Sequence, residues 1–159
     1  MSLDDWLLAL HVLSAFAFMA AIVLFWVLVV AIRRADTPAA TIETEPVVKV
    51  GNVAVAVGAT GTIVLGVWLA ISLDEHRIWD FWVIAAIVLW LLSGEAGRRT
   101  GLEYGRGMEK AKELRSSGQT GPSAELLALN RTSRGLLLHL ATTMLLVLIV
   151  LDMIWKPGA

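Results

Sequence analysis

Residues 6–32 read WLLALHVLSAFAFMAAIVLFWVLVVAI, the longest run of the sequence without a formal charge. It contains no Asp, Glu, Lys or Arg, and His11 is its only titratable side chain. An α-helix rises about 1.5 Å per residue, so roughly 20 apolar residues cross the hydrocarbon core of a bilayer. The stretch is long enough to do so, and it predicts that the chain is an integral membrane protein.

Three further apolar stretches predict three more crossings. With their ends placed in the interfacial region, the predicted spans are 6–32, 49–73, 79–98 and 134–155. Hydrophobic residues make up 57% of the 159 residues, against roughly 45–50% in an ordinary soluble domain. The expected fold class is all-α, an integral membrane four-helix bundle that forms one domain over 1–159. Residues 74–78 are expected to form a tight turn between antiparallel neighbours.

The basic residues predict the orientation of the bundle. Eleven of the 13 Lys and Arg residues lie in 33–49 or 98–134, and only Arg77 and Lys156 lie elsewhere. Loops rich in Lys and Arg stay in the cytoplasm. Both connections are therefore expected on the cytoplasmic side, with both termini on the non-cytoplasmic side.

The cytoplasmic loop 99–133 is expected to carry helical structure. Residues 118–122 (GQTGP) are typical of a turn, and Ser123 is suited to cap a new helix. We therefore expect spans three and four to continue as a short antiparallel helical hairpin. A partly disordered loop is the alternative, because the glycines between 101 and 107 weaken a helix.

Composition excludes several functional classes. The net charge of −1 argues against a nucleic-acid partner, since nucleic-acid-binding domains usually carry a basic excess. The chain has no cysteine, which excludes disulfides, thiolate metal sites, iron–sulfur clusters and covalently attached haem. The lipid bilayer is the expected partner, and any metal must be held by His, Met, carboxylate or carbonyl groups.

Four small residues, Ala54, Gly58, Thr62 and Gly66, recur at intervals of four in the second span. This spacing places them on one face of a helix. Such a face is typical of close packing between membrane helices. The alternative interpretation is that a flat cofactor packs against this face.

Two histidines lie inside the predicted spans. His11 follows Trp6 by five residues, and His139 follows Arg134 by five. Each His therefore lies about 7.5 Å from its own interface, on opposite sides of a core of about 30 Å, and their depths differ by roughly 15 Å. Neutral imidazole is a common ligand of haem iron or copper, so the two residues are candidate ligands of two different sites. A neutral His bonded to a hydroxyl or carbonyl is the alternative for each.

Two carboxylates are candidates for a proton relay. Glu95 has a predicted depth similar to that of His139, and Asp152 lies on the same side of the membrane as His11. Helical spacing offers simpler interpretations for both. Glu95 is expected to pair with Arg98 or Arg99, and Asp152 with Lys156 four residues later.

Three segments carry a family resemblance. Residues 7–13 (LLALHVL), 60–70 (TGTIVLGVWLA) and 155–158 (WKPG) resemble a group of small bacterial four-helix membrane proteins of unknown function. That group is akin to the HemJ-type protoporphyrinogen oxidases and to the membrane domain of copper-resistance D proteins. The resemblance implies a bacterial inner membrane location and a haem b whose axial ligand is His11.

Three functional classes follow. The first is a HemJ-like, b-type haem membrane protein with a redox or electron-transfer role toward a hydrophobic substrate such as a porphyrinogen or quinol. The second is transport of copper or protons along His11, Asp152, Glu95 and His139. The third is an accessory subunit of a larger membrane complex, or a homo-oligomer. Whether the chain is an enzyme stays open at this point.

Overall fold

The computed structural model describes residues 2–72 and 79–157, and the predicted turn at 74–78 lies outside them. The described residues form helices and no strand. The helices are α1 (Leu3–Arg34), α2 (Pro38–Ile42), α3 (Glu45–Ser72), α4 (Phe81–Ser116), α5 (Ala124–Asn130) and α6 (Ser133–Trp155). Four of the helical segments are long and apolar enough to cross a membrane, as the sequence predicts.

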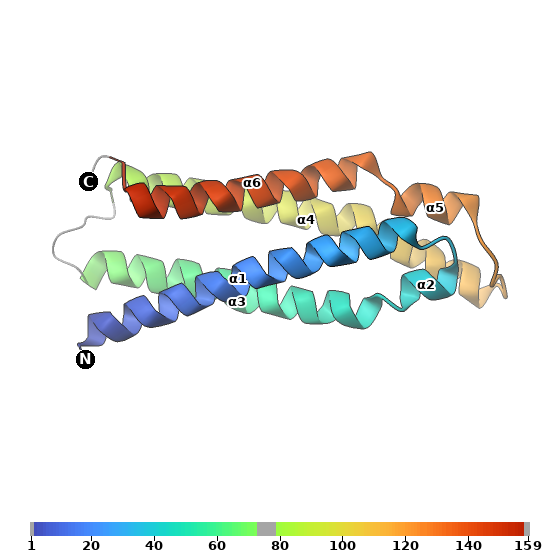
Figure 1. The fold of residues 1–159 in the computed structure, drawn as a ribbon, viewed down its shortest axis with the longest axis horizontal. Helices are drawn as coiled ribbons and strands as arrows, with labels where there is room; N and C mark the ends of the chain where they lie inside the picture. The colour runs from blue at the N-terminus through green and yellow to red at the C-terminus, as the bar shows by residue number, and fades with distance from the viewer. Residues whose placement is uncertain (1, 73–78, 158–159) are drawn as a thin grey trace.

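The long helices associate as two pairs (Figure 1). α1 packs along α3, and α4 packs along α6, whereas contacts between the two pairs are sparse. The start of α1 and the end of α6 lie at the same end of the bundle. We call this the terminal end, and we call the opposite end, which carries α2 and α5, the basic end.

The small-residue face of α3 is the surface against which α1 packs. A Cβ atom placed on Gly58 would lie 2.6 Å from the backbone nitrogen of Phe18. A Cβ atom on Gly51 would lie 3.0 Å from the ring of Phe25. The packing interpretation of this face is therefore confirmed, and α1 occupies the place that a flat cofactor would need.

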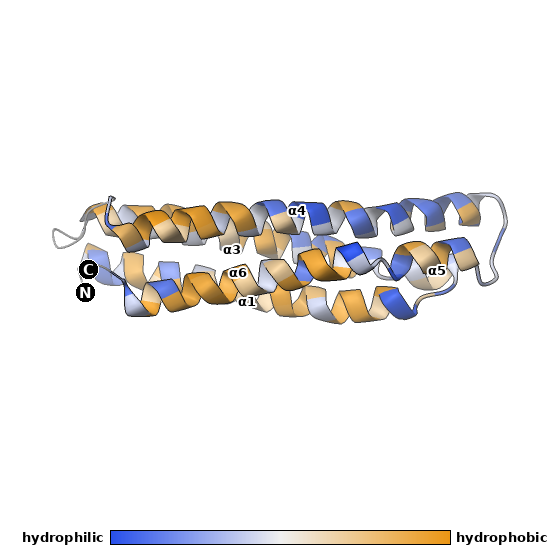
Figure 2. Cartoon of the chain, turned by 90° about the horizontal axis from the view of Figure 1, so that it is seen from above, coloured by the Kyte–Doolittle hydropathy of each residue, from blue (hydrophilic) through white to orange (hydrophobic). Residues whose placement is uncertain are grey.

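Apolar side chains cover the outside of the bundle. Val23 and Val27 on α1 are each 63% exposed, and Val53 and Val57 on α3 are 64% and 65% exposed. Figure 2 shows this apolar surface along α1 and α6, and a hydrophilic second half of α4. Apolar side chains directed outward are expected of helices that face lipid.

The connection between α4 and α6 is helical, so the helical hairpin is confirmed. α4 continues to Ser116, and Ser123 caps α5 by accepting a hydrogen bond from the backbone nitrogen of Leu126 at 3.3 Å. The glycines of α4 do not interrupt the helix. α2 is an element that the sequence analysis missed, although Thr37 followed by Pro38 is a typical helix start.

A buried asparagine joins the elements of the basic end. The Asn130 side chain is fully buried, and its amide nitrogen donates to the carbonyl of Ala35 at 3.0 Å and to the hydroxyl of Thr41 at 2.9 Å. These bonds connect α5 to the end of α1 and to α2. The connections between spans are thus ordered by specific polar contacts.

Candidate functional site

His11 lies on the face of α1 that meets α3. Its Nδ1 is 3.0 Å from the carbonyl oxygen of Thr62, whose own hydroxyl donates to the carbonyl of Gly58. A carbonyl only accepts, so Nδ1 carries the proton, and in the neutral ring Nε2 keeps its lone pair. Histidine ligands of metals are usually oriented in this way, by a bond from the second ring nitrogen to a carbonyl or carboxylate.

A cavity of about 470 Å³ adjoins this ring, between the two helix pairs at the terminal end. We call it the His11 cavity. Its lining is almost entirely apolar and includes Met19 from α1 and Met153 from α6. Two thioethers and one imidazole therefore border the same apolar space.

His139 lies deeper in the bundle, on α6, and is only 3% exposed. Its ring packs against Trp26 of α1, with 4.5 Å between the ring centroids. The Trp26 indole donates to the hydroxyl of Thr143 at 2.9 Å, and that hydroxyl donates to the backbone carbonyl of His139. The Nε2 of His139 is buried and has no hydrogen-bond partner among the described residues.

A second cavity, of about 630 Å³, adjoins His139 on the side of the basic end. We call it the His139 cavity. All four long helices line it, and Phe18 and Trp90 line both cavities. The two histidines therefore belong to different cavities, in agreement with the difference in depth that the sequence predicts.

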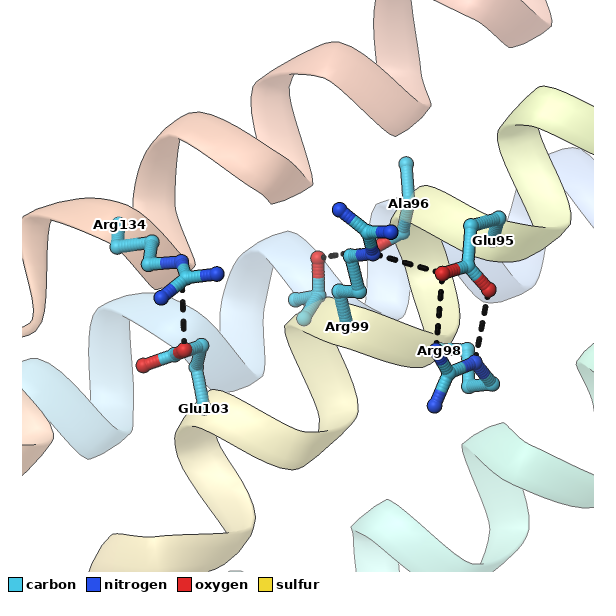
Figure 3. Close-up of polar contacts among 7 residues, drawn as sticks. Glu95, Ala96, Arg98, Arg99, Glu103 and Arg134 are labelled. Carbon is cyan, nitrogen blue, oxygen red and sulfur yellow. Dashed lines mark hydrogen bonds and ion pairs between the residues drawn. The ribbon is translucent and has the colours of Figure 1, made fainter.

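Glu95 is engaged by arginines on its own helix (Figure 3). Its carboxylate accepts from Arg98 at 2.8 Å and from Arg99 at 2.7 Å, the ion pairs that the helical spacing predicts. In the same region, Arg134 of α6 lies 3.5 Å from Glu103 of α4. Glu95 forms no bond to His139, so these two relay candidates are not brought together.

Asp152 does not pair with Lys156 as its spacing predicts. α6 ends at Trp155, and Lys156 has a left-handed backbone with φ of 41°, so helical spacing no longer holds there. The Lys156 ammonium instead lies over the ring of Trp82, 5.3 Å from its centroid. One carboxylate oxygen of Asp152 is buried without a hydrogen bond to the described residues.

Ion pairs tie the helices together at the basic end. Glu45, the first residue of α3, lies 3.0 Å from Lys49 and 3.0 Å from Lys112 of α4. Glu45 precedes the apolar part of its helix. The hydrogen bonds from Lys49 and Lys112 lower the pKa of its carboxyl below the usual range.

The four predicted site residues thus lie apart. No group of three or more His, Asp or Glu side chains suited to a metal occurs within residues 2–72 and 79–157. The sequence analysis missed Met153, Trp90 and Ser93, which line the cavities beside the two histidines. Met153 and Trp90 resemble ordinary core residues in the sequence, and no local signal distinguishes Ser93 from a residue that bonds to its own helix.

Comparison of the chain with protein-family models, with characterised proteins and with solved structures finds no match.

Proposed function

We propose that the chain is a b-type haem protein of the membrane with a redox or electron-transfer role, and that His11 is an axial ligand of the haem iron. The observation that carries this proposal is the hydrogen bond from His11 Nδ1 to the carbonyl of Thr62. This bond leaves Nε2 as the nitrogen with a free lone pair. It also fixes the direction of that lone pair.

The residues around His11 fit a haem. The cavity that adjoins the ring is large enough for a sizeable ligand and almost entirely apolar, as a porphyrin requires. Met153 on α6 would be the second residue to hold the haem iron, because it lines the same cavity from the other helix pair. His–Met ligation is one of the common haem arrangements.

Haem bound there would supply one-electron chemistry, and the chain would set its ligation, burial and access. The apolar lining excludes water from the space beside His11. The Thr62 carbonyl holds the neutral imidazole in one tautomer and one orientation. His139, the other candidate ligand in the sequence, lies beside a separate cavity.

The proposal includes an orientation. We place the basic end in the cytoplasm and the terminal end outside it, in the inner membrane of a bacterium. The eleven basic residues of the connections lie in the last turn of α1, the first two turns of α3, α4 from Arg98 onward, the junction of α5 and α6, and the first turn of α6. Glu45 and Glu95 pair with four of them. The Lys and Arg bias of short loops determines orientation.

Copper or proton transport has weaker support. His11, His139, Glu95 and Asp152 do not form a connected cluster among the described residues. The Glu95 carboxylate is already paired with two arginines. We therefore advance the haem proposal alone.

An absorption spectrum of the purified protein tests the proposal. After expression with adequate haem, we expect a Soret band in the wild type and in Leu137→Ala, a control at an exposed position of α6. His11→Ala should lose the band or greatly reduce it, and Met153→Leu should keep bound haem but change its spin state. A wild-type protein without a Soret band, or a His11→Ala protein with an unchanged one, contradicts the proposal.

A further inference from the structure

Two rows of glycines in this bundle have opposite surroundings. On α3, Cβ atoms built on Gly58 and Gly66 would lie 2.6 and 2.8 Å from atoms of α1. On α4, Gly94, Gly97, Gly101 and Gly105 also share one face, and they line the His139 cavity. Cβ atoms built on Gly94 and Gly101 would meet no described atom within 4 Å. The α3 row is filled by a helix, whereas the α4 row borders open space.

Three residues that line the same space carry buried polar atoms without partners. The Nε2 of His139, the hydroxyl of Ser93 and the indole nitrogen of Trp90 are buried and have no hydrogen-bond partner among the described residues. His139 is 3% exposed and Ser93 is 2% exposed. A buried polar atom without a partner destabilises the fold. Three such atoms on residues that line one cavity indicate a ligand that supplies their hydrogen bonds.

The charges at the edge of the cavity indicate a neutral ligand. Lys49 and Arg98 line its outer part, but Lys49 is paired with Glu45 at 3.0 Å and Arg98 with Glu95 at 2.8 Å. An acidic head group would have to compete with these carboxylates. A neutral head group faces no such competition.

We propose that the His139 cavity is a binding site for a membrane quinone or quinol. Carbonyl oxygens of the quinone would accept from the Trp90 indole, from the Ser93 hydroxyl and from the Nε2–H tautomer of His139. In the other tautomer, Nε2 would accept from a hydroxyl of the quinol. The flat ring would lie along the glycine row of α4. The role of the quinone as redox partner of the haem rests on the proposed function. The binding of the quinone is tested independently of haem.

The ring of His139 differs from that of His11 in a way that favours this assignment over a second haem. His11 is oriented by a hydrogen bond to the Thr62 carbonyl, the usual support of a metal ligand. His139 is instead positioned by its packing against Trp26. An imidazole placed in this way is suited to donate or accept a single hydrogen bond.

Binding is measured by quenching of tryptophan fluorescence, with the full chain in detergent and a decyl-substituted benzoquinone as the probe. We expect saturable quenching in the wild type. Ser93→Ala should weaken binding about 2- to 10-fold, the effect of one neutral hydrogen bond. Gly101→Leu should abolish binding by filling the cavity. Gly121→Leu, at an exposed loop position where a Cβ meets no described atom, should bind as the wild type does.

Two further measurements complete the test. Decylbenzene has a six-membered ring and the same tail without the carbonyls, and it does not itself quench tryptophan. In a competition experiment it should not displace the bound quinone. His139→Leu should bind the quinone more weakly while keeping the wild-type haem content. Equal binding of both probes, or wild-type affinity in Ser93→Ala and Gly101→Leu, overturns the proposal. Loss of haem from His139→Leu assigns the cavity to a second haem and also overturns it. The Soret band of His11→Ala is a separate readout, so failure of the haem proposal is distinguishable from failure of the quinone proposal.

Discussion

The ring of His11 lies directly against Gly66, one helical turn beyond the Thr62 carbonyl to which it is bonded. A Cβ atom built on Gly66 would be 2.8 Å from Cε1 and 3.1 Å from Nδ1 of the imidazole. These distances are shorter than van der Waals contact. Glycine at position 66 is therefore what allows His11 to reach the Thr62 carbonyl at 3.0 Å.

Gly66→Ala is expected to displace the His11 ring without unfolding the bundle, because the clash is with a side chain and not with backbone. The bond to Thr62 would be lost and the haem content would fall severalfold. Absorption per protein in the Soret region measures this. Gly121→Ala is the control, since its Cβ meets no described atom within 4 Å and the residue lines neither cavity. Equal haem content in the two variants would show that the His11 geometry is irrelevant to binding.

The sequence predicts the spans of this fold well and its polar details poorly. Long runs without charge fix the membrane helices, because burying a charge in lipid is costly. The same criterion begins the first predicted span at residue 6, whereas the helix α1 itself begins at Leu3. A capping box decides that start, with Ser2 accepting from the Asp5 backbone at 3.2 Å and Asp5 accepting from the Ser2 backbone at 2.7 Å.

The candidate site could be predicted only in part. Helical rise places His11 and His139 at different depths, and the structure has them beside different cavities. The bond from His11 to the Thr62 carbonyl could not be predicted, since it depends on how closely α1 approaches α3. Which side chains line the His139 cavity depends likewise on the packing of α4 against α6. The periodicity of either helix alone does not determine this packing.

Orientation is testable by labelling with cysteine, because the chain has none of its own. We expect Gly121→Cys, in the exposed connection of the basic end, to be unreactive in intact cells toward a maleimide that does not cross membranes, and to react after lysis. Leu3→Cys, 62% exposed at the terminal end, should react in intact cells. The reverse pattern would place the basic end outside the cytoplasm.

The lowered pKa of Glu45 predicts that the stability of the folded protein depends on pH. Its pKa is lowered in the folded protein by the hydrogen bonds from Lys49 and Lys112, so the folded state favours the ionised carboxylate. The stabilisation is present above the ordinary carboxyl pKa and is lost as the pH falls through the lowered folded value. The melting temperature of Glu45→Gln should therefore lie below that of the wild type at pH 7, and the two should converge in acid.

The control for this measurement is Glu109→Gln, at an exposed position of α4 that has no ion pair among the described residues. Its melting temperature should follow that of the wild type over the whole pH range. The interpretation is wrong if Glu45→Gln differs from the wild type by the same amount at pH 7 and in acid. In that case the effect of the substitution does not come from ionisation.

Asn130 is expected to contribute more to stability than any exposed polar side chain of the same loop. Asn130→Ala leaves the buried carbonyl of Ala35 without its donor, whereas Thr41 keeps its bond to the Thr37 carbonyl. A buried acceptor left without a partner costs about 1–3 kcal/mol. Asn130→Asp should cost more, because a carboxylate replaces the N–H donors and directs a negative oxygen at that carbonyl.

Denaturation in detergent, followed by circular dichroism, measures these losses. Gln119→Ala, at an exposed turn position, should change the free energy of unfolding by no more than about 0.5 kcal/mol. If Asn130→Ala is as stable as Gln119→Ala, the hydrogen bonds of Asn130 do not hold α5 to α1 and α2. If Asn130→Asp is the more stable of the two Asn130 variants, the amide donors are not what position 130 requires. The predicted order is therefore wild type and Gln119→Ala together, then Asn130→Ala, then Asn130→Asp.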